Sequence, residues 1–380
     1  MKSFRTKVGN LFMNFCSFFP LQDKVVFCCF NGNNCGDNPY LIFKEMKKKY
    51  PHFKYIWMMR NTNITIEGAK VERFVSFKSL FHLATAILWI DNTRKPSWFV
   101  KRKGQYYVQT WHGDVCIKKI EKDAESTLDE EYVLEAKHDS KMCDLMLSGS
   151  SFRTDNYKSS FWYDGEILEY GTPQAEIFYY NPEPIKEKIK NYYGIPEDAY
   201  IALYCPTFRK NDSLDAYNID FIKLQKSLAI RWPGKWYIVV RLHPNIRHLQ
   251  NNIDYTDMII NGSDYVFTNE LIVASEIIIT DYSGCMFDAL EAHKKVVLYA
   301  SDIDNYLEHE RGMYFDIHKM PFPLTTTNSG LAKAIIEFDE NEYKTATEQF
   351  RRIIGYKTTK GSTEKIVDYI YNKIKGASNS

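Results

Sequence analysis

The sequence predicts an α/β protein with two domains, each containing a parallel β-sheet. The chain has 380 residues, which exceeds the size at which a single hydrophobic core usually stops growing. Short runs of β-branched and aromatic residues alternate with helical stretches, as is typical of parallel βαβ units. A proline-marked segment, Asn181-Pro-Glu-Pro-Ile-Lys, separates two sets of such runs. We therefore expect a first domain over residues 23–178 and a second over 179–376.

Ten strands are expected from these runs. In the first domain they cover Lys24–Phe30, Lys54–Met59, Ile87–Asp91, Gln105–Thr110, Cys143–Ser148 and Ile167–Tyr170. In the second domain they cover Tyr200–Cys205, Trp236–Leu242, Glu276–Thr280 and Lys295–Tyr299. One amphipathic helix is expected from about Thr363 to Lys375 at the C-terminal end.

The first 22 residues form a separate basic and aromatic segment. Lys2, Arg5 and Lys7 precede a set of apolar residues near helical spacing, which comprises Leu11, Phe12, Phe15, Phe18 and Phe19. No small-residue cleavage site follows, so a signal peptide is not expected. The segment is either a helix that lies in a membrane interface or a helix docked on the core of the first domain.

Composition excludes several classes of protein. A net charge of +1 gives no general attraction to nucleic acid. The eight cysteines are scattered without CxxC spacing, which predicts a reducing cytoplasm and no metal site. No apolar run is long enough to span a bilayer. The high content of Tyr and Phe suits a large core or a surface that meets sugars or lipid headgroups.

Polar residues follow four of the predicted strands. Because ligands bind beyond the carboxyl ends of the strands in open parallel sheets, these residues predict a site for a phosphorylated ligand. The four segments are Trp111-His112-Gly113-Asp114, Pro206-Thr207-Phe208-Arg209, Arg241-Leu242-His243-Pro244 and Asp281-Tyr282-Ser283-Gly284.

The segment after the Glu276–Thr280 strand enters a helix expected over Cys285–His293. Ser283 can cap this helix and leave backbone N–H groups that bind a diphosphate without a metal. Asp288, one turn later, can meet a hydroxyl of the ligand. Taken alone, the same residues also fit an ordinary strand–turn–helix junction.

Histidines and arginines supply the chemistry of the predicted site. His243 can donate to a phosphate or leaving group, and Arg209 and Arg241 suit phosphate by their planar guanidinium. His112 is placed to act as a general base for an attacking hydroxyl. The structural alternatives are an ordinary hydrogen bond for His243 and, for His112, a cap on a helix that begins near Asp114.

A basic and aromatic stretch runs from Arg94 to Lys103. It can face anionic lipid headgroups or the diphosphate of an acceptor, but a solvated loop is the favoured interpretation.

In their order along the chain, these segments resemble the CDP-glycerol glycerophosphotransferase family of teichoic-acid and capsule biosynthesis. The likeness covers about residues 24 to 370. It rests on Asp37-Asn-Pro-Tyr, Gln109-Thr-Trp-His-Gly, Cys205-Pro-Thr-Phe-Arg, Arg241-Leu-His-Pro, Thr280-Asp-Tyr-Ser-Gly-Cys-Met-Phe-Asp288 and Glu310-Arg-Gly-Met-Tyr-Phe-Asp316.

The resemblance implies a GT-B-like pair of Rossmann-like domains with a cleft between them. It implies a cytoplasmic enzyme, peripheral on the inner face of the cell membrane, that uses CDP-glycerol or CDP-ribitol, a lipid-linked or polymeric glycan acceptor and no cofactor. His112 and His243 carry over as catalytic residues. The substrate-binding set is Trp111, Gly113, Asp114, Gln174, Pro206, Thr207, Arg209, Arg241, Leu242, Asp281, Ser283, Gly284 and Asp288.

Three departures from the family pattern flank the expected reaction centre. Asp114-Val115-Cys116 replaces Thr-Pro-Leu, Gln174 stands where an arginine is common, and Ser283-Gly284 replaces paired serines. They leave open which polyol phosphate is transferred.

Two other functions fit the same segments. One is a GT-B glycosyltransferase that uses a nucleotide sugar, and the other is a catalytically silent binding protein. Intact His112 and His243 argue against the silent protein.

Overall fold

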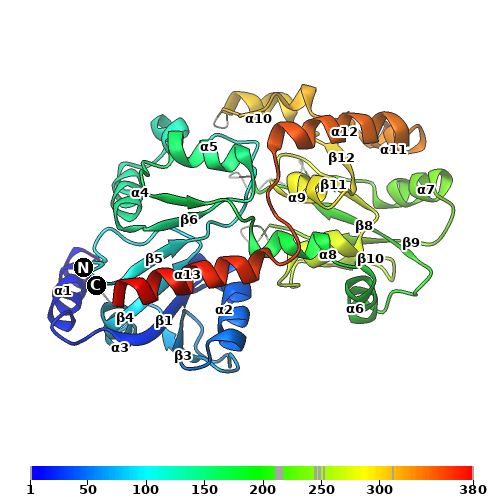
Figure 1. Cartoon of the computed structure of the whole chain (residues 1–380). Coiled ribbons are helices and arrows are strands. Elements are labelled where there is room, and N and C mark those ends of the chain that lie inside the picture. Colours follow the sequence, from blue (N-terminus) through cyan, green and yellow to red (C-terminus); the bar gives the residue numbers. More distant parts are fainter. Residues whose placement is uncertain are drawn as a thin grey trace. The chain divides into compact units, whose positions relative to one another are not determined.

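A computed structural model of the chain describes residues 2–209, 217–243, 246, 250, 253–309 and 312–378. This part of the chain forms two compact units, each with its own sheet (Figure 1). The first unit contains the chain up to Asp114, Ile120–Glu176 and the chain from Lys357. The second contains Val115–Lys119 and Ile177–Tyr356.

The sheet of the first unit has seven strands in the order β3-β2-β1-β4-β5-β6-β7. All neighbouring pairs are parallel. Asp91 is paired in register with Cys28 on one side and Gln109 on the other, so β1, β4 and β5 end at the same edge. The strands are β1 (Gln22–Cys28), β2 (Lys54–Met59), β3 (Lys70–Arg73), β4 (Ala86–Asp91), β5 (Tyr106–Gln109), β6 (Leu145–Leu147) and β7 (Glu166–Leu168).

The sheet of the second unit has six parallel strands in the order β10-β9-β8-β11-β12-β13. Cys205 pairs with Thr280, and Tyr204 pairs with Val240, so β8, β9 and β11 also end together. The strands are β8 (Tyr200–Cys205), β9 (Trp236–Val240), β10 (Ile259–Asn261), β11 (Ile277–Thr280), β12 (Lys295–Tyr299) and β13 (Leu324–Thr325).

Two parallel α/β sheets confirm the predicted fold class. All ten expected strands are present. Most are short apolar runs that the structure buries, and in β9 and β11 every residue is buried. The sequence did not indicate β3, β10 and β13. These strands are only two to four residues long and lie towards the sheet edges, and β3 carries Lys70, Glu72 and Arg73.

Helices connect the strands of both sheets (Figure 1). In the first unit they are α1 (Lys2–Cys16), α2 (Asp37–Lys49), α3 (Phe77–Thr85), α4 (Glu130–Met142), α5 (Ser151–Ser160) and α13 (Ser362–Ser378). In the second unit they are α6 (Glu183–Tyr193), α7 (Phe221–Arg231), α8 (Thr268–Ala274), α9 (Cys285–Glu291), α10 (Ile303–His309), α11 (Asn328–Ile336) and α12 (Glu340–Ile354).

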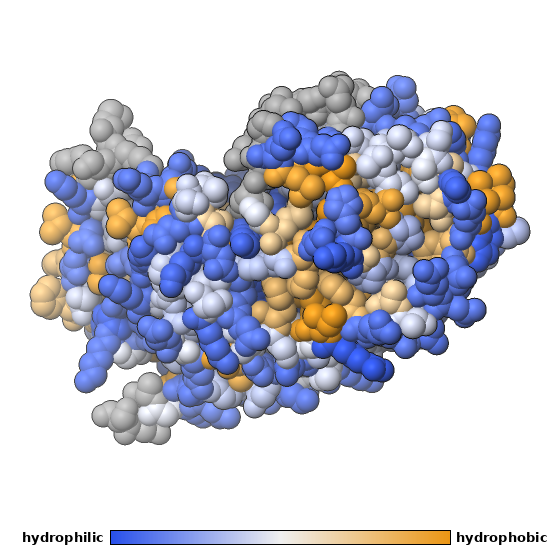
Figure 2. Space-filling model, turned by 90° about the horizontal axis from the view of Figure 1, so that it is seen from above, coloured by the Kyte–Doolittle hydropathy of each residue, from blue (hydrophilic) through white to orange (hydrophobic). Residues whose placement is uncertain are grey.

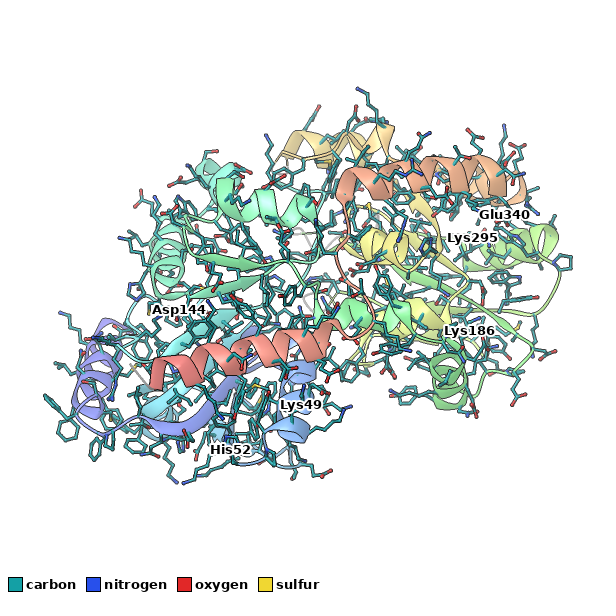
Figure 3. All side chains as sticks on the ribbon, in the orientation of Figure 1. Lys49, His52, Asp144, Lys186, Lys295 and Glu340 are labelled. Atoms are coloured by element: carbon teal, nitrogen blue, oxygen red, sulfur yellow. The ribbon has the colours of Figure 1, made fainter. Side chains whose placement is uncertain are left out.

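The C-terminal helix α13 belongs to the first unit, although the sequence places it in the second domain. Its apolar face, Ile366, Val367, Ile370 and Ile374, is buried in the core of the first sheet. On its polar face, Glu364 and Asp368 bind Lys49 of α2, which Figure 3 shows beside α13. The amphipathic pattern predicts the helix, but it does not say which of two sheets the apolar face covers.

Helix α1 docks on the first unit by one face and exposes the other. Met13 and Cys16 are buried, Phe12 packs edge-on against Phe77 of α3, and the Asn10 amide donates to the Trp98 carbonyl at 2.9 Å. Phe15 on the other face is 60% exposed, and Phe18, two residues beyond the end of α1, is 87% exposed. The prediction that this N-terminal helix docks on the core of the first domain is therefore confirmed for one of its faces. Among the described residues no helix is long and apolar enough to cross a membrane.

Candidate active site

The predicted site residues fall into two groups, one in each unit. The group of the first unit centres on His112, three residues after β5. The residue is exposed, and its Nδ1 lies 2.7 Å from the main-chain oxygen of Asn92, which follows β4. A carbonyl oxygen only accepts hydrogen bonds, so Nδ1 must carry the hydrogen. In the neutral ring, Nε2 is then free to accept a proton.

The surroundings of His112 favour its neutral form. Although the residue as a whole is exposed, the protein around the imidazole desolvates it and lowers its pKa. Arg153 and Arg94 lower the pKa further, against the opposite effects of the Asn92 carbonyl and Glu121. A neutral imidazole with an open Nε2 is the form that a general base requires at pH 7.

Buried Arg153 of α5 shapes the loop after His112. Its guanidinium donates to the main-chain oxygens of Gly113 and Asp114. The Asp114 carboxylate is buried, which raises its pKa, and it accepts from the Gly149 N–H at 2.7 Å. No helix begins at Asp114 in this described segment, so the prediction of a helix there is wrong. The two carbonyls that would bond within such a helix bind Arg153 instead.

Two other predicted residues of the first unit contact this loop or its neighbours. Trp111, with a left-handed φ of 54°, stacks its ring on His112 at 4.6 Å. The main-chain N–H of Gln174 donates to Asn38 Oδ1 at 2.9 Å, and the Asn38 amide donates to the Trp111 carbonyl. The main chain of Gln174 is thereby linked through Asn38 to the residue that precedes His112.

The group of the second unit lies where β8, β9 and β11 end, and we call it the strand-end site. The Asp281 carboxylate joins two of its segments, because it accepts from the Thr207 N–H at 2.8 Å and from its neighbour Tyr282. The Thr207 hydroxyl is buried and has no hydrogen-bond partner among the described residues. The members are Pro206, Thr207, Arg209, Arg241, Leu242, His243, Asp281, Ser283 and Gly284.

Arg209 holds this site together from inside. Its guanidinium donates to Asp302 at 2.7 and 3.0 Å, to Asp281 at 2.8 Å and to the Thr207 carbonyl at 2.7 Å. Only 7% of the side chain is exposed. The role of Arg209 as a donor to the diphosphate stays a prediction, and four of its five N–H groups are engaged within the protein.

The turn into α9 differs from the predicted cap. Gly284 is the N-cap of α9, and the Ser283 hydroxyl accepts from the Cys285 N–H at 3.4 Å. The helix ends at Glu291, two residues earlier than predicted, with half-buried Asp288 in its first turn. A Cβ built on exposed Gly284 would lie 3.4 Å from the Val115 carbonyl oxygen, so the chain at Val115 runs close to this turn.

His243 and Arg241 follow β9. The Arg241 guanidinium donates to the carbonyls of Gly262 and Tyr265, and the N–H of buried Leu242 donates to Ser263. Although His243 is exposed, partial desolvation by the protein around it lowers its pKa, and the charges of Lys118 and Arg241 lower the pKa further. The motif residues Pro244, Glu310 and Arg311 lie outside the described residues.

Lys118 also adjoins the strand-end site, although its position in the sequence gave no indication of this. The segment Val115–Lys119 joins the second unit by an antiparallel bridge between Lys118 and Met313. The Lys118 ammonium donates to the Tyr306 hydroxyl at 2.7 Å and lies close enough to His243 to affect its titration. In the sequence, Lys118 is seen only as the first of two adjacent lysines, six residues after His112. Such a pair occurs equally in solvated loops, so its spacing does not indicate a binding site.

The basic stretch 94–103 does not present all its charges to solvent. Arg94 is buried between Glu121 and Asp139, at 2.7 and 3.1 Å, and buried Lys95 pairs with Asp91. The solvated-loop interpretation is therefore wrong for these two residues, because each has a buried carboxylate partner. Arg102 donates to the main-chain oxygens of Ser17 and Phe19, beyond the end of α1.

No group of three or more His, Cys, Asp or Glu side chains that could hold a metal ion occurs in the part of the chain that the structure describes. The charged groups around the strand-end site are Arg209, Arg241, Lys118, Asp281 and Asp302.

Comparisons with known proteins give a consistent result. Residues 11–372 match the family described as CDP-glycerol:poly(glycerophosphate) glycerophosphotransferase. The teichoic acid poly(glycerol phosphate) polymerase of Staphylococcus epidermidis is 29% identical over 94% of this chain and 53% of its own length. That of Bacillus spizizenii is 29% identical over 88% of each chain. The chain thus spans about half the length of the first relative and most of the second.

A solved structure agrees with these sequence relatives. The wall teichoic acid polymerase TagF, in a structure soaked with CDPG, superposes with a TM-score of 0.85 at 26% identity. The match covers 97% of this chain and 94% of that one.

Proposed function

Because the chain belongs to the CDP-glycerol:poly(glycerophosphate) glycerophosphotransferase family, we propose that it transfers glycerol phosphate from CDP-glycerol to a hydroxyl of a teichoic-acid-like acceptor. The observation that carries this proposal is His112. Its lowered pKa favours the neutral ring at pH 7, its Nδ1–H is bound to the Asn92 carbonyl, and its Nε2 is left to take a proton.

The proposed reaction is a displacement at phosphorus. The acceptor oxygen attacks the phosphorus that bears glycerol, and the bond from that phosphorus to the bridging oxygen breaks. CMP leaves with the bridging oxygen, and the acceptor's proton passes to Nε2 of His112. His243 would hold or protonate the departing phosphate.

The donor would bind at the strand-end site of the second unit. The buried Thr207 hydroxyl, which lacks a partner among the described residues, supports this assignment, because buried polar groups are normally hydrogen-bonded. Lys118, Arg241 and His243 supply charge or N–H donors beside it. Ser283, Gly284 and Asp288 complete the proposed donor set on the turn into α9.

Two assays test the reaction and the donor. The protein is incubated with CDP-glycerol, CDP-ribitol or a nucleotide sugar, together with a glycerol-phosphate oligomer, and CMP release and product mass are measured. We expect CMP from CDP-glycerol and a product that gains glycerol plus phosphate. If CMP were released from CDP-ribitol but not from CDP-glycerol, the transferred group would be ribitol phosphate. A sugar added without phosphate would refute the proposed reaction in favour of a glycosyltransferase.

Histidine variants test the two catalytic assignments. His112→Ala should lower turnover by about 10²–10⁴-fold, the usual contribution of a general base, with little change in donor affinity. His243→Ala should weaken donor binding, turnover or both. Substantial turnover by His112→Ala would remove His112 as the base and would make Asp114, the nearest carboxylate along the chain, the next candidate.

We further propose that the protein works at the inner face of a membrane, on a lipid-linked or polymeric acceptor. The support is the outer face of α1, where Leu11 and Phe15 are 69% and 60% exposed, together with Phe18 just beyond its end, which is 87% exposed. In Figure 2, apolar side chains gather at the left margin, the side on which Figure 1 places α1. Exposed Lys7 on α1 and Lys78 on α3 add positive charge suited to anionic lipid.

Point variants separate this membrane face from the docked face of α1. Phe15→Ser with Phe18→Ser should lower binding to anionic liposomes by roughly tenfold or more, because two large apolar side chains are lost from the contact. Leu134→Ser, which removes a 65% exposed side chain from α4 of the same unit, is the matched control. Equal liposome binding by all three proteins would refute the membrane role of α1.

A further inference from the structure

The surroundings of His112 contain several residues in a strained backbone conformation. Phe30, Asp37 and Trp111 all have φ between 46° and 57°, in the left-handed region that β-carbons disfavour. Phe30 lies in the loop after β1, Asp37 begins α2, and Trp111 precedes His112. Such strain persists where surrounding contacts fix the chain. Phe30 and Asp37 both bind one buried residue, Asn92, which also binds His112, the residue after Trp111.

Asn92 binds three different segments of the first unit. Its side-chain NH₂ donates to Asp37 Oδ2 at 2.9 Å, and its Oδ1 accepts from the Phe30 N–H at 2.8 Å. Its main-chain oxygen accepts from Nδ1 of His112 at 2.7 Å. The Phe30 ring also meets the His112 ring edge-on at 5.4 Å. Asn92 therefore connects Asp37 to His112 by two routes, its own carbonyl and the Phe30 loop.

A carboxylate at position 37 fixes the orientation of the Asn92 amide. Asp37 accepts on both oxygens, from the Asn38 N–H at 2.6 Å and from Asn92. An amide at position 37 would keep one acceptor and turn its NH₂ towards the NH₂ of Asn92. Rotating the Asn92 amide would relieve that contact, but the Phe30 N–H would then lose its acceptor.

We propose that Asp37 is a positioning residue which, through Asn92, holds His112 in the tautomer with a free Nε2. This proposal rests on the proposed function, in which His112 is the general base. It adds a residue whose two carboxylate oxygens accept from Asn38 and Asn92 within the protein. The charge of Asp37 keeps Asn92 turned so that the Phe30 loop and the Asn92 carbonyl both support the imidazole.

Because Asp37 can be protonated, the support that it gives to His112 through Asn92 should depend on pH. Burial raises the pKa of Asp37 to about 6, so the carboxylate is charged at pH 7 and becomes protonated below pH 6. The Cys29 thiol is the titratable neighbour of Asp37, and the charged groups that face His112 are Arg153, Arg94 and Glu121. On acidification, turnover should therefore fall with two protonations, those of His112 and Asp37.

The experiment compares Asp37→Asn, Asn92→Ala, their double variant and Asp23→Asn, which removes an exposed carboxylate from β1 as a control. Asp37→Asn should lower kcat by roughly 10- to 100-fold, the usual effect of a misplaced catalytic group, while the KM for CDP-glycerol stays within about twofold. Between pH 5 and 6 the logarithm of kcat should fall more steeply in wild type than in Asp37→Asn, because only the wild type loses the charge of Asp37 in this range.

Two readouts do not depend on activity. In protein labelled with ¹⁵N-histidine, with His112→Ala used for assignment, the His112 ring should report hydrogen on Nδ1 in wild type and a mixture of tautomers in Asp37→Asn. The thermal midpoint of Asp37→Asn at pH 7 should stay within about 3 °C of wild type, because a desolvated charge and a hydrogen bond are lost together.

The double variant should be no slower than the slower single variant, because both changes break one connection. Wild-type kcat, slope and His112 tautomer in Asp37→Asn would overturn the inference. A lower kcat accompanied by a higher KM and a lower thermal midpoint would also overturn it, because such changes together indicate a structural role. Full activity of His112→Ala would instead refute the proposed base, and this result is separate from any result on Asp37.

Discussion

Arg209→Ala tests whether Arg209 braces the strand-end site or contacts the donor. The guanidinium makes four hydrogen bonds, two to Asp302, one to Asp281 and one to the Thr207 carbonyl. The side chains of Asp281 and Asp302 are 3% and 19% exposed. Removing Arg209 therefore leaves one buried carboxylate and one half-buried carboxylate without their cation.

The size of the effect follows from this geometry. Removing one partner of a buried ion pair costs about 3–5 kcal/mol. Because Asp302 keeps some access to water, we expect a loss near the lower limit, about 3 kcal/mol. In a unit of this size that corresponds to a fall of roughly 6–12 °C in thermal midpoint. A double variant, Arg209→Met with Asp281→Asn, should recover part of the loss, because the amide that replaces the Asp281 carboxylate is uncharged and retains an oxygen that accepts from the Thr207 N–H.

Thermal and urea unfolding of the three proteins are measured beside calorimetric titration with CDP-glycerol. A brace predicts a large loss of stability, with donor affinity reduced only as far as the Thr207 segment becomes disordered. A direct phosphate contact predicts the opposite. If Arg209→Ala kept wild-type stability and lost 10- to 100-fold in donor affinity, the structural reasoning would be refuted and the original assignment restored.

Four further predictions concern other parts of the molecule. Lys118→Ala should raise the Kd for CDP-glycerol by roughly 10- to 100-fold, which is the value of one charge-assisted contact. Lys119→Ala, the control, should change this Kd little. If calorimetry gave equal effects for the two variants, Lys118 would have no specific role in binding the donor. Gly171→Ala should lower the free energy of unfolding by at least about 2 kcal/mol, because its φ is +94° and a Cβ there would lie 2.4 Å from the Thr358 Cα. Gly194→Ala is the control: its φ is +66°, but a Cβ there would meet open space, so it should lower the free energy of unfolding by only about 1 kcal/mol in the same urea titration. Since burial lowers the His112 pKa below its ordinary 6.5, turnover should stay constant from pH 8 to 7 and fall only below pH 6.5, and a pH profile that breaks above 7 would contradict this sign. Activity should survive dialysis against a chelator, because we assign the diphosphate to N–H groups and cations; complete loss that magnesium or manganese alone restores would show a required metal.

Local sequence patterns were sufficient to predict the two sheets and the four polar strand ends. Apolar runs of four to six residues between turn signals formed buried strands, as in β8 and β11. Parallel strands that pair in register end at one edge, so Thr207, His243 and Ser283 could be grouped from their positions alone. The order of the motifs along the chain then led to the family.

The tertiary structure decided which polar groups of the site pair with one another. Arg209 and Asp281 are 72 residues apart and Arg94 and Glu121 are 27 apart, so no periodicity relates them. The sequence therefore assigned Arg209 to the ligand and left Arg94 in a solvated loop. Lys118 was missed for the same reason, since its place depends on a bridge to Met313.

Local sequence patterns also could not predict which of the two units helix α13 packs against. Its apolar face is defined by a spacing of three to four residues, which is a property of the helix itself. Which core receives that face depends on the ion pairs to Lys49 and on the apolar surface left open by the first sheet. Secondary structure follows from interactions between near neighbours in the chain. The pairing of charges and the docking of helices depend on distances in space between residues far apart in sequence, and only the folded chain sets those distances.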